Sequence, residues 1–248
     1  MSAKDHYDNL LSSVYSWFIG DFDEKQKAQA QFFEANGIKP EGKGYAIDLG
    51  AGNGLQSVSL AKLGFAVKAI DFSANMLAEI SAKKGNLDIE TINDDISNFG
   101  KYINTTGLIV CMGDTIAHLD SFDTLENLIN LCHATLDSNG MLVLSFRDYS
   151  EELDDTERFI HVKSDDTKIL TCFLEYSPDK IKVTDLLYEK IDGSWELKSG
   201  SYSKLRLTSE YVEEILEDAG FAIEKSEVID GMYFLIAKKS DNSEEYKT

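Results

Sequence analysis

The segment AIDLGAGNG, residues 46–54, has the residue types of a site where a ligand meets bare backbone. An apolar run ends in Asp48, and glycines follow at positions 50, 52 and 54. Because glycine has no Cβ, a ligand can approach the main chain closely there, and parallel sheets bind ligands at the carboxyl ends of their strands. A dinucleotide fingerprint needs G-x-G-x-x-G, but the sixth position counted from Gly50 is Leu55.

Carboxylates stand where the next two apolar runs end. Asp71 closes VKAID, and a carboxylate at that point can accept hydrogen bonds from both ribose hydroxyls of a nucleoside. Asp94 and Asp95 follow ETIN, where one of them could receive an adenine amino hydrogen, and the sequence leaves the choice between them open. Cys111 and Met112 end the fourth run. These neighbouring strand ends suit one bound nucleoside.

Further polar side chains follow the fourth and fifth runs. His118 lies in TIAHL, where a neutral imidazole could take a proton from an attacking amine or hydroxyl, or could simply pack or cap a helix. Arg147 and Tyr149, in SFRDYS, either bind a substrate or tie down the segment that follows. The cysteines lie far apart in apolar runs, so the sequence predicts no metal site.

Two kinds of periodicity organise the elements that position these residues. Residues 44–150 alternate short runs rich in Val, Ile and Leu with amphipathic stretches, which predicts a parallel sheet between helices. Residues 151–207 contain runs of alternating apolar and polar residues between turn sequences, which predicts antiparallel strands. A helical pattern and two strands return over 208–240. The β-rich region therefore interrupts an α/β domain.

With these motifs, the sequence resembles the class I S-adenosylmethionine-dependent methyltransferases, on AIDLGAGNG, AIDFSANML, NDDI and CMGDTIAHL. The resemblance implies a Rossmann-like α/β fold with a seven-stranded sheet whose last strand is antiparallel. It also implies S-adenosylmethionine as cofactor. Its cofactor-binding residues here would be Tyr15, Asp48, Gly50, Gly52, Asp71, Phe72, Met76, Asp95, Ile96 and Met112.

A second resemblance is to the small-molecule N-methyltransferases of that class, such as those acting on amino sugars and glycine. It implies a helical lid over residues 1–43, carrying Tyr15, and an inserted antiparallel β region over 151–207. The cofactor domain would comprise 44–150 and 208–240, followed by a polar tail over 241–248. Arg147 and Tyr149 would bind the substrate, and His118 is the candidate base.

The composition restricts the partners. With 24 Lys and Arg against 44 Asp and Glu, the formal charge is −20, which disfavours nucleic acid and anionic membranes. We expect a cytoplasmic enzyme that methylates nitrogen or oxygen of a small molecule, with a possible homodimer through the edges of the inserted strands. The alternatives are a nicotinamide-dependent Rossmann oxidoreductase and a non-catalytic module that binds S-adenosylmethionine.

Overall fold

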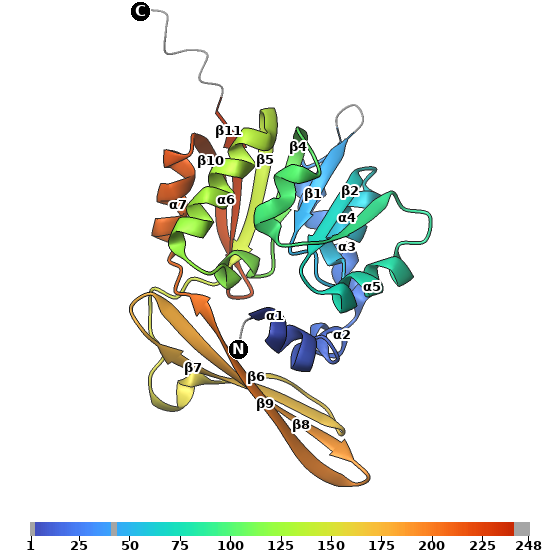
Figure 1. The fold of residues 1–248 in the computed structure, drawn as a ribbon, viewed down its shortest axis with the longest axis vertical. Coiled ribbons are helices and arrows are strands. Elements are labelled where there is room, and N and C mark those ends of the chain that lie inside the picture. Colours follow the sequence, from blue (N-terminus) through green and yellow to red (C-terminus); the bar gives the residue numbers. More distant parts are fainter. Residues whose placement is uncertain (1–2, 41–43, 241–248) are drawn as a thin grey trace, which may run out of the picture.

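The computed structural model describes residues 3–40 and 44–240, so the tail expected over 241–248 lies outside the described residues. Two separate sheets form the structure, one of seven strands and one of four (Figure 1). In the part of the chain described, no helix is both long and apolar enough to cross a membrane.

The larger sheet has the strand order β10-β11-β5-β4-β1-β2-β3. β11 runs antiparallel to both of its neighbours, whereas the pairs among β1 to β5 are parallel. The predicted α/β fold with its closing antiparallel strand is therefore confirmed. The strands are β1 (Tyr45–Leu49), β2 (Ala66–Asp71), β3 (Ile89–Asn93), β4 (Thr106–Cys111), β5 (Leu136–Phe146), β10 (Phe221–Ile229) and β11 (Met232–Lys239).

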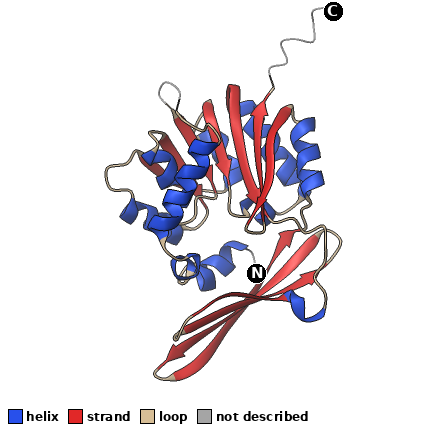
Figure 2. Cartoon of the chain, turned by 180° about the vertical axis from the view of Figure 1, so that it is seen from behind, coloured by secondary structure: helices blue, strands red, loops and turns tan. Residues whose placement is uncertain are grey.

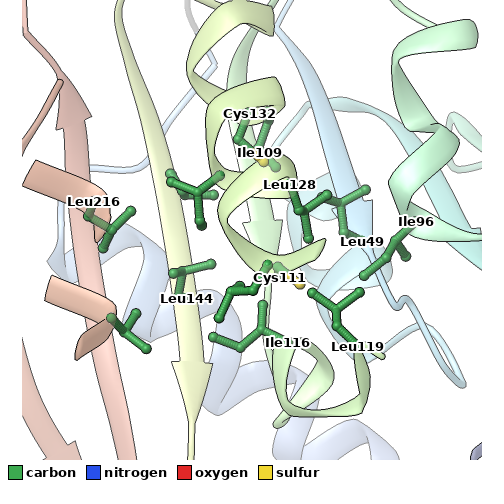
Figure 3. Packing of buried hydrophobic residues seen from close by; sticks show 14 of the residues in the cluster. Leu49, Ile96, Ile109, Cys111, Ile116, Leu119, Leu128, Cys132, Leu144 and Leu216 are labelled. Atoms are coloured by element: carbon green, nitrogen blue, oxygen red, sulfur yellow. The ribbon is translucent and has the colours of Figure 1, made fainter. Parts of the chain in front are cut away.

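Helices cover both faces of this sheet, which is why its strands are apolar on both sides. Figure 3 shows one face, where side chains of α6 (Phe122–Thr135) and α7 (Ser209–Asp218) pack on β1, β4 and β5. The other face packs on α3 (Phe22–Ala35), α4 (Leu55–Lys62) and α5 (Ala74–Lys83). Short 3₁₀ helices follow β3 and β4, namely η2 (Ile96–Lys101) and η3 (Thr115–His118).

The smaller sheet is the antiparallel insertion that the alternating pattern predicts. It has the order β6-β7-β8-β9, and a 3₁₀ helix, η4 (Asp155–Arg158), precedes it. Its inner face carries side chains such as Leu170, Val183 and Leu187, which are buried. Its strands are β6 (Phe159–Ser164), β7 (Lys168–Tyr176), β8 (Lys180–Ile191) and β9 (Ser194–Leu205).

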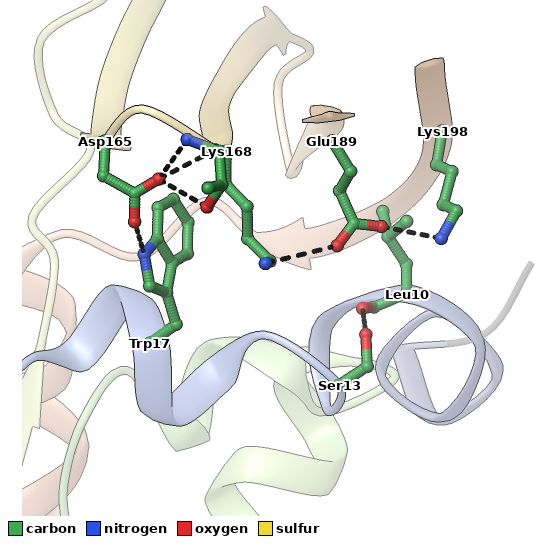
Figure 4. Close-up of polar contacts among 8 residues, drawn as sticks. Leu10, Ser13, Trp17, Asp165, Lys168, Glu189 and Lys198 are labelled. Atoms are coloured by element: carbon green, nitrogen blue, oxygen red, sulfur yellow. Dashed lines mark hydrogen bonds and ion pairs between the residues drawn. The ribbon is translucent and has the colours of Figure 1, made fainter. Parts of the chain in front are cut away.

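The N-terminal helices lie between the two sheets (Figures 1 and 2). They are α1 (Ala3–His6), the π-helix η1 (Tyr7–Leu11) and α2 (Tyr15–Ile19). Leu10 and Val14 from this segment form a buried cluster with Leu170 and Leu187 of the insertion. Close to that cluster, the Trp17 indole donates to Asp165 over 2.6 Å, as Figure 4 shows.

Asp48 occupies a different place from the one expected. The sequence analysis puts it among the cofactor residues, but its carboxylate is 1% exposed and faces α4, where it accepts a 2.5 Å hydrogen bond from Ser57. Burial is the main cause that raises the pKa of Asp48 to about 7, and nearby Asp71 adds to it. Asp48 therefore connects the end of β1 to α4 and supports the glycine loop between them.

The raised pKa of Asp48 predicts a specific pH dependence of stability. The folded state binds the Asp48 proton more tightly than the unfolded chain does. The protonated side chain therefore adds to the free energy of unfolding at about pH 4, and this stabilisation is lost as the pH rises through about 7. In Asp48→Asn the side chain stays neutral and its oxygen still accepts from Ser57. We expect the free energy of unfolding of the variant, relative to the wild type, to increase between pH 4 and pH 8 in urea titrations. A constant difference across that range would contradict the prediction.

The buried cluster that contains Leu187 joins the insertion to the N-terminal helices, so we expect it to contribute to the free energy of unfolding. Leu187 is 0% exposed, so Leu187→Ala leaves a cavity and is expected to cost about 2–5 kcal/mol of unfolding free energy. Leu197 lies on the other face of the sheet and is 51% exposed, so Leu197→Ala is expected to stay within about 0.5 kcal/mol of the wild type. Equal losses of unfolding free energy for the two variants in urea denaturation would mean that the buried cluster adds no stability.

Candidate functional site

A cavity of about 230 Å³ lies at the carboxyl edge of the larger sheet. Residues from the ends of β1, β2 and β4 line it, together with η2, η3 and the N-terminal helices. Every predicted cofactor residue except Asp48 lines this cavity, and so does His118. The predicted members in its wall are Tyr15, Gly50, Gly52, Asp71, Phe72, Met76, Asp95, Ile96 and Met112.

The loop after β1 exposes its backbone to this cavity. Gly50 and Gly52 have φ angles of +73° and +52°, which favour glycine. A Cβ at Gly50 would lie 2.3 Å from Cγ2 of Thr115, so a side chain does not fit there. A Cβ at Gly52 would lie 3.5 Å from Cε of Met76, within the cavity wall. Gly50 therefore lets Thr115 of η3 pack against the loop, and Gly52 keeps a side chain out of the cavity wall.

Asp71 holds that loop in place and also faces the cavity. Its two carboxylate oxygens accept 2.8 Å hydrogen bonds from the backbone N–H groups of Gly52 and Ser73. Burial raises the pKa of Asp71, and the same two hydrogen bonds oppose that shift. A carboxylate oxygen has more than one lone pair, so each can also accept from a ligand hydroxyl. The position therefore suits a ribose.

The structure separates the two acids that the sequence could not. Asp95 lines the cavity, and its carboxylate accepts from the backbone N–H of Ser97 at the start of η2. Asp94 is not part of the wall, because its carboxylate accepts from Tyr102 and Asn98 over 2.6 and 2.9 Å. Of the two, Asp95 is the residue placed to meet a ligand.

A larger cavity of about 860 Å³ adjoins the first one. It extends from α3, past the carboxyl edge of β4 and β5, to the inner face of the inserted sheet. Tyr7, Tyr15, Met112, Gly113 and His118 line both cavities. A molecule in one cavity can therefore come into contact with a molecule in the other.

His118 stands at the junction of the two cavities, among aromatic rings. Its ring lies 5.6 Å from that of Tyr7 and is stacked 5.4 Å from that of Tyr202. Nδ1 is buried and has no hydrogen-bond partner among the described residues. Burial, followed by the charge of Lys204, lowers the pKa of His118 to about 3, so the imidazole is neutral near pH 7.

A buried ion pair joins the inserted sheet to the loop after β4. Nζ of Lys204 lies 2.6 Å from Oδ2 of Asp114. Burial opposes both charges, yet Asp114 raises the pKa of Lys204, and Lys204 in turn lowers that of Asp114. Asp114 also accepts from the backbone N–H of Arg147 and has a φ of +72°. The Asp114 carboxylate therefore connects β9 of the insertion with the loops that follow β4 and β5.

The residues after β5, Arg147, Asp148 and Tyr149, all line the larger cavity. Asp148 also ties the chain down, because it accepts from the backbone N–H groups of Ser150 and Ser209. The guanidinium of Arg147 forms no ion pair with any carboxylate in the described ranges. Tyr149 is buried, with its hydroxyl 3.5 Å from Nζ of Lys204.

The sequence analysis did not select Tyr7, Asp114 or Lys204 as site residues. Tyr7 lies within 6.4 Å of the rings of Tyr15, Phe72, His118 and Tyr202. The sequence around Lys204 gave no signal, because the alternation in SKLRL groups it with Arg206 and apart from the leucines. The partner, Asp114, lies 90 positions away in sequence, so only the fold identifies it.

Comparisons with known proteins agree with this architecture. Residues 46–140 match the model of a methyltransferase domain. A glycine/sarcosine N-methyltransferase from Halorhodospira halochloris is 31% identical over 143 residues, which cover 54% of this chain and 51% of that protein. Human glycine N-methyltransferase is 24% identical over 228 residues, covering 81% and 75%. The chain thus spans about half the length of the Halorhodospira relative.

Solved structures share the fold over almost the whole chain. An S-adenosylmethionine-dependent methyltransferase from Clostridium acetobutylicum superposes with a TM-score of 0.73 at 17% identity, covering 96% of this chain and 97% of that one. This likeness includes the insertion as well as the larger sheet. The sequence match over residues 46–140 shows a methyltransferase domain, and the strand order is that of the fold shared with S-adenosylmethionine-dependent methyltransferases.

Proposed function

We propose that this chain binds S-adenosylmethionine in the smaller cavity and methylates the nitrogen of a small molecule held in the larger one. The observation that carries the proposal is the shared wall, in which Tyr7, Met112 and His118 border both cavities. Donor and acceptor must approach in line and away from water, and holding them so can supply about 7–11 kcal/mol. Adjoining cavities at the end of β4 meet that need.

The residues of the smaller cavity fit S-adenosylmethionine. Gly50 and Gly52 would leave the backbone bare for the amino acid part, and Asp71 would accept from the ribose hydroxyls. Phe72 and Met76 would flank the adenine, and Asp95 and Ile96 would lie at its amino edge. When bound, this cofactor supplies a methyl group on a positively charged sulfur. Tyr15 and Met112 would close the cavity around it.

The properties of His118 favour nitrogen over oxygen as the acceptor atom. A hydroxyl needs a base, but a pKa of about 3 makes this imidazole a poor one. An amine can attack with its own lone pair. Its nitrogen bonds to the methyl carbon as the carbon–sulfur bond breaks, and the proton that it then sheds passes to water. In this role His118 orients the amine through a hydrogen bond.

The acceptor that we propose is an amine that also carries a carboxylate. The matching relatives are named as glycine or glycine/sarcosine N-methyltransferases, and both of those substrates have this pair of groups. Arg147 offers the larger cavity a guanidinium without an ion-pair partner in the described chain, and arginine binds carboxylates with two hydrogen bonds. Tyr149, two positions further along the chain, lines the same space.

The proposal also assigns a role to each region of the chain. Residues 44–150 and 208–240 act as the cofactor domain, 1–43 as its lid and 151–207 as the roof over the acceptor. The enzyme is proposed to be cytoplasmic, and its high negative charge disfavours nucleic acid and anionic membranes as partners. Exposed strands at the edges of the insertion support a homodimer, which light scattering would test.

Binding of the demethylated product provides the first test. Asp71→Asn keeps the size of the side chain but removes the charge that the ribose hydroxyls would contact. Since hydrogen bonds to charged groups contribute about 1.5–3 kcal/mol, we expect S-adenosylhomocysteine to bind roughly tenfold to a hundredfold more weakly in calorimetry. Asp94→Asn, outside the cavity wall, is the matched control and should bind like the wild type.

The same measurements separate the competing functions. If NAD but not S-adenosylhomocysteine protects the wild type against heating, the chain is a nicotinamide-dependent enzyme. If S-adenosylhomocysteine binds but no labelled methyl group reaches any amine, phenol or carboxylate tested, it is a non-catalytic module. Binding together with transfer to an amine supports the proposal.

The role of Arg147 predicts a change in KM more than in kcat. Arg147→Gln keeps polarity but removes the charge, so we expect KM for sarcosine to rise about tenfold or more, with the KM for S-adenosylmethionine unchanged. Arg158→Gln removes a guanidinium from η4, outside both cavities, and should leave both constants unchanged. An equal fall in kcat with constant KM would contradict the binding role.

A further inference from the structure

The geometry of the larger cavity points to an acceptor that is much bulkier than glycine. We infer that the amine is carried on a largely apolar body, which lies against the inner face of the inserted sheet. This inference rests on the proposed function and deepens it, because it states what kind of amine is methylated.

The first argument is size. The larger cavity measures about 860 Å³, within the range of about 300–1,000 Å³ that is typical of sites for drug-sized ligands. Glycine or sarcosine would fill only a small part of it and would leave most of the wall in contact with water. Arg147 and His118 account for the polar ends of such a small molecule, but not for the space beyond them.

The second argument is the character of the wall. Ile160 and Val162 of β6 and Ile229 at the end of β10 line the cavity while 37%, 39% and 37% exposed. Leu174 and Val183 continue the same apolar surface on β7 and β8. Contiguous apolar surface that is kept open to water marks a binding groove, because covering it with an apolar ligand is favourable.

The third argument is that the charged side chains which the inserted sheet contributes to this wall already have partners. Asp185 pairs with His6 over 2.7 Å, and Lys204 with Asp114 over 2.6 Å. A sugar or nucleotide body would require free donors and acceptors here, whereas hydrocarbon or an aromatic ring does not. The wall therefore fits an apolar body whose charged end reaches Arg147 at the rim.

The test is a comparison of matched acceptors with the full chain. We expect kcat/KM for L-phenylalanine to exceed that for glycine by about tenfold or more, since burying such a side chain is worth at least that factor. The same order is expected for 2-phenylethylamine over methylamine, which removes the carboxylate and isolates the apolar body. Glycine or sarcosine as the preferred acceptor would overturn the inference.

A pair of variants on β6 locates the body. Ile160→Trp replaces an aliphatic side chain of the cavity wall with a larger aromatic one. Phe159→Trp changes the neighbouring residue, which is 54% exposed and does not line the cavity. We expect Ile160→Trp to change the ratio of phenylalanine to glycine turnover about tenfold, and Phe159→Trp to leave it unchanged. An unchanged ratio in both would overturn the placement against the inserted sheet.

Binding of S-adenosylhomocysteine distinguishes the two levels of failure. It is measured by calorimetry in the wild type and in both variants, and normal affinity shows that the chain is folded and its smaller cavity intact. Normal affinity with glycine preferred removes only the apolar acceptor. Lack of affinity in the wild type removes the proposed function, and this inference with it.

Discussion

The buried ion pair between Asp114 and Lys204 is the interaction on which the arrangement of the two sheets depends. It joins the loop after β4 to β9 of the insertion, and both residues line the larger cavity. Removing water from two charges is costly, and the attraction offsets that cost only when the geometry is close and both partners are present. Breaking one partner of such a pair typically costs about 3–5 kcal/mol. The inserted sheet is therefore held at one defined position over the carboxyl edge of the larger sheet.

The N-terminal segment completes this arrangement by binding both sheets. On the side of the smaller cavity, Lys4 donates to the backbone oxygen of Phe72, and Ser73 donates to Asp8. On the side of the insertion, His6 pairs with Asp185. The segment places Tyr7 between these contacts, at the junction of the cavities. The two cavities are thus formed jointly by three stretches of chain that are far apart in sequence.

The two cavities differ in how they are built. The smaller one uses backbone, short loops and carboxylates at strand ends, which suit one polar ligand of defined shape. The larger one is lined by side chains of the insertion, of the N-terminal helices and of the hairpin formed by β10 and β11. Side chains on a sheet face can change without altering the strands that carry them. The surface of the larger cavity can therefore vary while the common fold and the smaller cavity stay the same.

The sequence alone determined the fold and most of the smaller cavity. Alternating periods predict which residues form strands and helices, and glycines 50 and 52 with Asp71 mark the loop, because these signals are local in the chain. Only the tertiary structure decided that Asp48 faces Ser57, that Asp95 rather than Asp94 meets the cavity, and that His118 is a weak base. It also decided that Lys204 pairs with Asp114. Those outcomes depend on burial and on contacts between distant segments, which no local pattern contains.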